Sequence, residues 1–140
     1  MKKRFKNWKY PEIEEGKLTK WNWLVQHVGN FHLGFGVDVG AFVYINAKNG
    51  VDIDDGVQIS SHCSIYSVST IDNKEGRIVL KKNCRIGSHT VIMPGVTIGE
   101  NAIVGAGSVI KHDTKILSNE IWVGTLAHRI GKIENGKRKY

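Results

Sequence analysis

Isoleucine or valine returns every sixth residue through the middle of this 140-residue chain, and this period constrains the fold more than any other feature. From residue 86 onward the repeated positions are Ile86, Ile92, Ile98, Val104, Ile110 and Ile116. The fifth place of each six is small or β-branched, as in Thr90, Val96, Ala102 and Ser108. A period of six fits neither the 3.6-residue stripe of a helix nor the two-residue alternation of a strand. It is typical of short strands joined by corners, three sides to a turn, and therefore predicts an all-β fold, a parallel β-helix.

The repeat also divides the chain into segments of what we expect to be one domain, since 140 residues is within the usual size of one. Coils are expected over residues 33–125, interrupted by a polar loop that leaves them at residues 66–79. Residues 1–26 do not keep the period and are expected to cap the first coil. Residues 126–140 are expected to form a basic tail.

Three hexads make one coil, so residues 18 apart should lie side by side, about 4.8 Å from each other. Ser88 then lies beside Ala106. If the loop at 66–79 uses up no side of the coil, His62 lies one coil from His89, on the same side of the prism.

Net charge, terminal segments and cysteine positions indicate in which compartment the protein works and which partners it could bind, but they do not identify its function. The net charge of +7 favours anionic partners, but the basic residues crowd the two ends without interleaved aromatic residues, which argues against nucleic acid. No signal peptide and no run of about 18 apolar residues is visible, so we expect a cytoplasmic protein without a membrane span. Cys63 and Cys84 both occupy the fifth place of a hexad and are interpreted as core residues. No cysteine or histidine spacing suggests a metal site.

The segment from residue 85 to 110 reads RIGSHTVIMPGVTIGENAIVGAGSVI and resembles the hexapeptide-repeat acyltransferases. The match is to the galactoside and maltose O-acetyltransferases and the related sugar N-acetyltransferases, over about residues 33–131. The resemblance implies a left-handed β-helix, although parallel crossovers are right-handed in most other proteins. It also implies a homotrimer in which acyl-CoA lies in a groove between adjacent subunits.

Two departures from the family pattern affect the site. The prolines of two C-terminal turns are missing, since residues 111–114 read KHDT and residues 124–127 read GTLA. Many members carry a catalytic histidine in the excursion loop, whereas this loop has none and places Asp72 near the corresponding position.

Acyl transfer from a thioester needs a base for the proton of the acceptor and donors for the developing oxyanion. Histidine suits the role of base because its ordinary pKa is close to neutral. His62 is our first candidate for general base and His89 the second, both at corners; the alternative is that they are surface imidazoles. Asp72 and Asn73 could orient the base or bind the sugar, or serve as ordinary turn residues, and Asn46 is a candidate contact to the acceptor.

For acetyl-CoA as co-substrate, Ser88 and Ala106 match positions whose backbone groups bind the pantetheine arm. Gly87 and Gly105 would let that arm approach the coil, although corners of this fold use glycine in any case. Four basic side chains are candidates to hold the CoA phosphates by charge-assisted bonds: Lys111, His128, Arg129 and Lys132.

These observations favour an acetyl-CoA-dependent acyltransferase that modifies a hydroxyl or amino group of a sugar or nucleotide sugar, as in surface-polysaccharide assembly. The loop without histidine favours an amino sugar slightly, because a neutral amine needs less help than a hydroxyl. Two alternatives remain: a non-catalytic scaffolding β-helix, and a zinc enzyme of the γ-type carbonic anhydrase class. The second is disfavoured because the coils lack a pair of histidines five residues apart.

Overall fold

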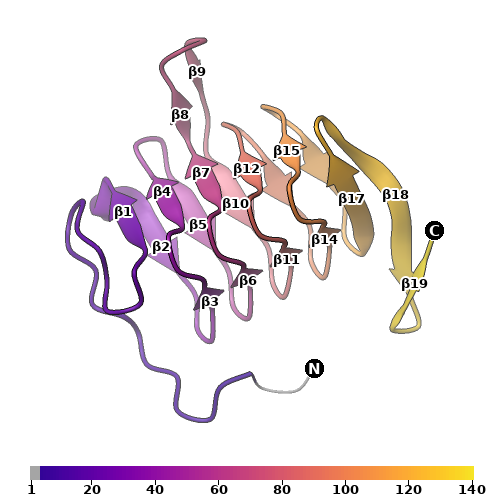
Figure 1. Cartoon of the computed structure of the whole chain (residues 1–140), viewed down its shortest axis with the longest axis horizontal. Helices are drawn as coiled ribbons and strands as arrows, with labels where there is room; N and C mark the ends of the chain where they lie inside the picture. The colour runs from indigo at the N-terminus through magenta and orange to yellow at the C-terminus, as the bar shows by residue number, and fades with distance from the viewer. Residues whose placement is uncertain (1–3) are drawn as a thin grey trace.

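Three sheets of mainly parallel strands form the sides of a prism in the computed structural model, which describes residues 4–140 (Figure 1). We call the sheets walls A, B and C. Wall A contains β1 (Leu24–Gln26), β4 (Tyr44–Asn46), β7 (Ser64–Tyr66), β12 (Val91–Ile92) and β15 (Val109–Ile110). Wall B contains β2 (Phe31–Leu33), β5 (Val51–Ile53), β10 (Ile78–Leu80), β13 (Thr97–Ile98) and β16 (Lys115–Ile116). Wall C contains β3 (Asp38–Val39), β6 (Gln58–Ile59), β11 (Arg85–Ile86), β14 (Ile103–Val104), β17 (Glu120–Gly124), β18 (Ala127–Glu134) and β19 (Lys137–Lys139).

The chain visits walls A, B and C in that order, so one coil contributes one strand to each wall. From β1 to β17, each strand of a wall pairs in parallel with the strand one coil away; Ile86, for example, aligns with Ile59 on one side and Val104 on the other. The six-residue period therefore makes a parallel β-helix, as the sequence predicts.

The repeated isoleucines line the inside of the prism. On wall A the column of aligned residues is Ile45, Ile65, Ile92 and Ile110, all with 0% exposure. The small residues at the fifth place are buried beside them, and among them are Cys63 and Cys84, which are free thiols. The expectation that both cysteines are core residues is confirmed.

Glycine at the corners is required by the spacing of the coils. A Cβ on Gly99 would lie 2.4 Å from the amide nitrogen of Ser118 in the next coil, closer than backbone atoms can approach. Gly29, in the 3₁₀ helix η1 (Val28–Asn30) between β1 and β2, has open space around the same position.

Replacing Gly99 by alanine is therefore expected to destabilise the protein by about 1–3 kcal/mol, because the backbone of the next coil must shift. Gly29→Ala serves as the control and should change stability by less than about 0.5 kcal/mol. Urea unfolding of both variants measures the difference. Equal effects at the two positions would show that contact between coils is not the reason for Gly99.

The loop expected at 66–79 is a β-hairpin that projects from the corner between walls A and B (Figure 1). Its strands are β8 (Val68–Ser69) and β9 (Lys74–Glu75), paired antiparallel. Its base is tied to the coil, since the Ser67 hydroxyl donates to the carbonyl of Asn46 at 2.7 Å. The chain enters the hairpin from wall A and returns to wall B, so the excursion uses up no wall.

The boundary expected at the N-terminal end is wrong. The coils begin at β1, not at residue 33, and β1 pairs with β4 in full register. Trp23 and Phe31 occupy buried positions of this first coil, at 2% and 9% exposure, with ring centroids 6.4 Å apart. Large aromatic rings break the hexad pattern in sequence because they close the end of the prism, where no further coil follows. The cap is thus made partly by the first coil itself.

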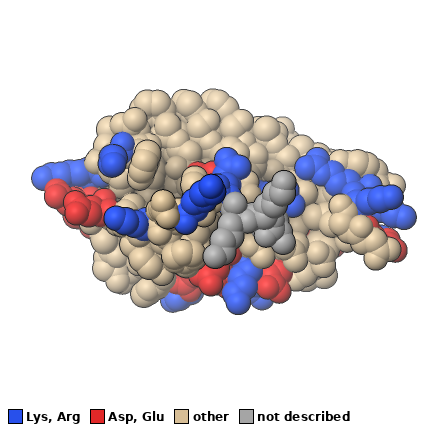
Figure 2. All heavy atoms as spheres, turned by 90° about the horizontal axis from the view of Figure 1, so that it is seen from below, with Lys and Arg blue, Asp and Glu red and all other residues tan. Residues whose placement is uncertain are grey.

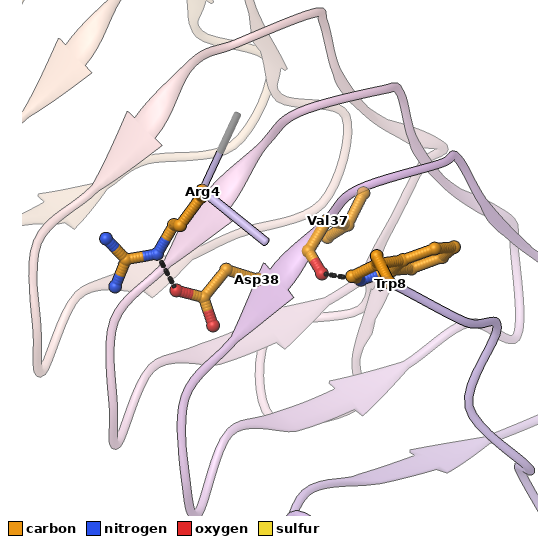
Figure 3. Close-up of polar contacts among 4 residues, drawn as sticks. All are labelled: Arg4, Trp8, Val37 and Asp38. Carbon is orange, nitrogen blue, oxygen red and sulfur yellow. Dashed lines mark hydrogen bonds and ion pairs between the residues drawn. The ribbon is translucent and has the colours of Figure 1, made fainter. Parts of the chain in front are cut away.

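The segment before β1 runs along the outside of the prism and is pinned at two points (Figure 3). Arg4 forms an ion pair with Asp38 of β3. The indole N–H of Trp8 donates to the carbonyl of Val37 at 2.8 Å. Residues 1–3, the start of the expected cap, lie outside the described residues.

The expectation of a tail at residues 126–140 is also wrong. β18 pairs antiparallel with β17, and β19 pairs with β18, so the segment extends wall C at the C-terminal end (Figure 1). Between β18 and β19, Asn135 and Gly136 have φ angles of 51° and 72°. Asn-Gly with positive φ at both residues is a strong hairpin signal, and it was visible in the sequence.

Candidate active site

Both candidate bases lie at one corner, between wall C and wall A, which we call the histidine corner. In successive coils it is formed by residues 40–42, 60–62, 87–89 and 105–107. The rings of His62 and His89 stack there with centroids 4.7 Å apart and planes 7° from parallel. Both side chains are exposed, so a substrate can reach them. The prediction that the two histidines lie one coil apart on the same side of the prism is confirmed.

The backbone of this corner is fixed by hydrogen bonds between coils. The amide of His62 donates to the carbonyl of Ala41 at 3.0 Å, and the amide of His89 donates to Ser61 at 3.2 Å. Each ring therefore projects from an anchored position, which holds the start of the side chain in place.

A third ring belongs to this stack and was missed from the sequence. Phe42 packs against the other face of His62, with centroids 5.4 Å apart and planes at 43°. Its place was visible, since Phe42, His62 and His89 each stand three residues after the repeated position of their hexad, at Val39, Ile59 and Ile86. A phenylalanine has no titratable group, so a search for acid–base residues does not single it out.

The candidate pantetheine contacts lie at the same corner. Ser88 precedes His89, and its carbonyl accepts a hydrogen bond from the amide of Gly107 at 2.8 Å, which places Ala106 beside it. The glycines have a structural reason of their own: a Cβ on Gly87 would lie 2.4 Å from the nitrogen of Ala106, and one on Gly105 would lie 2.7 Å from the side chain of Val123. Coil stacking requires glycine at 87 and 105 whether or not a cofactor binds.

The candidate acceptor contacts lie elsewhere, at the corner between walls A and B, which we call the hairpin corner. Asn46 ends β4 there, and its Oδ1 accepts from the amide of Lys48 at 3.1 Å, as in an ordinary Asx turn. Asp72 and Asn73 are exposed in the turn between β8 and β9. Wall A lies between the two corners. The five residues that lead from His62 to the hairpin span roughly 16 Å when extended, which is the approximate distance between the corners. One chain alone therefore does not bring Asn46, Asp72 or Asn73 to His62.

The four candidate phosphate ligands are divided between two places. Lys111 is exposed at the hairpin corner, after β15, whereas His128, Arg129 and Lys132 belong to β18. Lys and Arg side chains gather at the end of the molecule formed by β18 and β19, at the right in Figure 2.

Two of these cations already have partners on the protein. Arg129 pairs with Glu120 at 3.1 Å, and Lys132 pairs with Glu134 at 3.3 Å. The Lys132–Glu134 pair is at the surface, where an ion pair contributes about 0–1 kcal/mol, so an incoming phosphate can replace Glu134 at little cost. Glu120 is half-buried and also accepts from the amide of Leu117 and the indole of Trp122, so it keeps these two partners if Arg129 turns to a phosphate.

Neither cysteine supplies a nucleophile. Burial raises the pKa of the Cys84 thiol to about 12, and burial also raises the pKa of Cys63, whose Sγ lies 3.1 Å from the carbonyl of Gly87. The thiolate is the reactive form, so both thiols remain unreactive at neutral pH. The ionisable groups at the histidine corner are then the two imidazoles.

Within residues 4–140, no group of three His, Cys, Asp or Glu side chains is arranged to hold a metal ion. The described part of the chain also contains no helix with the length and apolar character needed to cross a membrane. A hollow of about 890 Å³ lies between the N-terminal segment and the first coils; Trp8, Trp21 and Val37 are among its lining residues, and none of the site residues expected from the sequence is.

Known proteins with a similar sequence or structure share this architecture. Residues 77–112, which include His89 and all four candidate pantetheine contacts, match the family described as bacterial transferase hexapeptide (six repeats). The chain thus carries the six-residue repeat of this family over residues 77–112. The all-β, left-handed parallel β-helix expected from the resemblance is thereby confirmed.

Its relatives include the galactoside O-acetyltransferase of Escherichia coli, strain K12. The two sequences are 41% identical over 63 residues, which are 45% of this chain and 30% of that protein. The matched segment thus spans less than a third of the length of this curated relative.

Two solved structures share the fold. The maltose O-acetyltransferase from Clostridium difficile 630 superposes with a TM-score of 0.69 at 26% identity, over 81% of this chain and 65% of that one. A variant of AntD, an N-acyltransferase from Bacillus cereus in complex with dTDP-4-amino-4,6-dideoxyglucose and coenzyme A, superposes with a TM-score of 0.54 at 26% identity. That match covers 79% of this chain and 70% of AntD.

Proposed function

We propose that this hexapeptide-repeat protein transfers an acetyl group from acetyl-CoA to a hydroxyl or amino group of a sugar or nucleotide sugar. The observation that carries the proposal is the histidine corner. There a stacked pair of exposed imidazoles lies on the same edge as Ser88 and Ala106, the positions expected to bind pantetheine. The sugar and the nucleotide sugar as acceptor classes are supported by the maltose enzyme and by AntD respectively.

In the proposed reaction His62 removes the proton from the acceptor as its oxygen or nitrogen attacks the thioester carbonyl. The carbon–sulfur bond then breaks, and the CoA thiolate takes up a proton on release. The oxyanion that forms in between requires a hydrogen-bond donor at the same site. No nucleophile of the protein is needed, in agreement with the buried, unreactive thiols.

We further propose that the working unit is a homotrimer. The histidine corner and the hairpin corner lie on opposite edges of wall A, so Asp72, Asn73 and Lys111 of one copy can reach His62 only on a neighbouring copy. A groove between copies would bring acceptor and phosphate contacts to the base. Sedimentation of the protein at three times the mass of the chain is the expected result.

The activity is tested by following free thiol released from acetyl-CoA with a panel of hydroxyl-sugars and amino-sugars, each free and nucleotide-linked. We expect acceptor-dependent thiol release with at least one class, and binding of acetyl-CoA in calorimetry without acceptor. Absence of both would support the scaffolding alternative instead. Acetylation of an amino sugar, but not of its hydroxyl analogue, would identify the acceptor atom as nitrogen.

A further inference from the structure

Phe42 stands in a backbone conformation that its residue type rarely adopts. Among residues 4–140, most non-glycine residues with positive φ are Asn or Asp; the four exceptions are His27, Phe42, His62 and His89. A left-handed residue with a Cβ costs about 1–2 kcal/mol, and asparagine tolerates this conformation because its side chain bonds locally. Three of the four exceptions lie in one column of the histidine corner, with φ angles of 62°, 63° and 57°.

The corner itself does not require aromatic side chains. The same column begins with Asn22 (φ 64°) one coil before Phe42 and continues with Gly107 (φ 70°) one coil after His89. Both are residue types that adopt the left-handed region at low cost. Residues that adopt this conformation at low conformational cost, Asn22 and Gly107, therefore stand directly before and after the three rings in the column.

Packing within one chain does not explain Phe42 either. The residue is 58% exposed in the single chain, so the fold of one copy buries less than half of a large apolar surface. Its ring contact at this corner is with His62, which is held between Phe42 on one face and His89 on the other. A costly backbone conformation at a site with little burial points to a functional role.

We propose that Phe42 is a positioning residue: it holds the imidazole of His62 in the orientation that accepts the proton of the acceptor. The inference rests on the proposed function, with His62 as the general base. Without Phe42, one face of an exposed imidazole is open and its side chain is free to rotate. A base displaced by about 1 Å can lose up to 10²-fold in rate.

The test replaces Phe42 by asparagine and, as the conservative variant, by tyrosine. Asparagine suits the left-handed corner, so Phe42→Asn should keep or raise Tm, which separates this effect from loss of folding. We expect kcat of Phe42→Asn to fall on the order of tenfold with the KM for acetyl-CoA and acceptor little changed, because orientation of the base acts on the chemical step. Phe42→Tyr, which keeps the ring, should retain kcat near that of the unmodified protein.

A double variant tests whether Phe42 acts on kcat through His62. In a His62→Ala background, Phe42→Asn should lower kcat no further, because the residue it positions is gone. Additive losses, an unchanged kcat in Phe42→Asn, or a fall in kcat that accompanies dissociation of the oligomer would each overturn the positioning role. Failure of the unmodified protein to turn over any acceptor would instead overturn the proposed function, and the inference with it.

Discussion

Alanine in place of His62 is expected to lower kcat for acetyl transfer by about 10²–10⁴-fold, the usual contribution of a general base. The effect should be largest with a hydroxyl acceptor, which is a poor nucleophile until it loses its proton. Steady-state rates of thiol release from acetyl-CoA at neutral pH measure it. The fold should be unaffected, because His62 is exposed and its substitution removes no core contact.

His89→Ala is the matched control, since it removes the other member of the stacked pair at the same corner and in the same backbone conformation. We expect a smaller loss, because His89 supports one face of His62 without acting as the base. An unchanged kcat/KM in His62→Ala would remove it from the mechanism. A larger loss in His89→Ala than in His62→Ala would transfer the role of base to His89.

The largest expected effect on stability is at Ile65, in the middle of the buried column of wall A. Truncation to alanine should cost about 2–5 kcal/mol, because the aligned Ile45 and Ile92 on either side are held by their own strands and cannot fill the space. Urea unfolding followed by circular dichroism measures the loss of unfolding free energy.

Ile71 offers the control for the same chemical change, since it lies at the tip of the β8–β9 hairpin and is 97% exposed. Ile71→Ala should change stability by less than about 0.5 kcal/mol. Similar losses of unfolding free energy at positions 65 and 71 would show that burial of Ile65 is not the reason for its contribution to stability.

Much of the site was predictable because it follows from the phase of the repeat. His62, His89, Ser88 and Ala106 could be assigned to one corner from their places within hexads. The roles of all the candidate site residues remain predictions. Those of Asn46, Asp72, Asn73, Lys111, His128, Arg129 and Lys132 depend in addition on how copies of the chain meet. Phe42 was overlooked although it shares the hexad place of both histidines, because its importance lies in a ring contact and a backbone angle rather than in its chemistry.

The sequence by itself determined the prism, since a side chain that returns every six residues must face the same interior, whatever lies between the coils. The tertiary structure decided the features that the six-residue period does not describe, namely the two ends of the prism and the excursion. Trp23 and Phe31 close the first coil because an end has no neighbouring coil to cover it. Residues 127–139 leave the six-residue period and pair as antiparallel strands on wall C. It also decided that the 66–79 excursion uses no wall, which places His62 against His89, because backbone hydrogen bonds between coils and not local preference set that register.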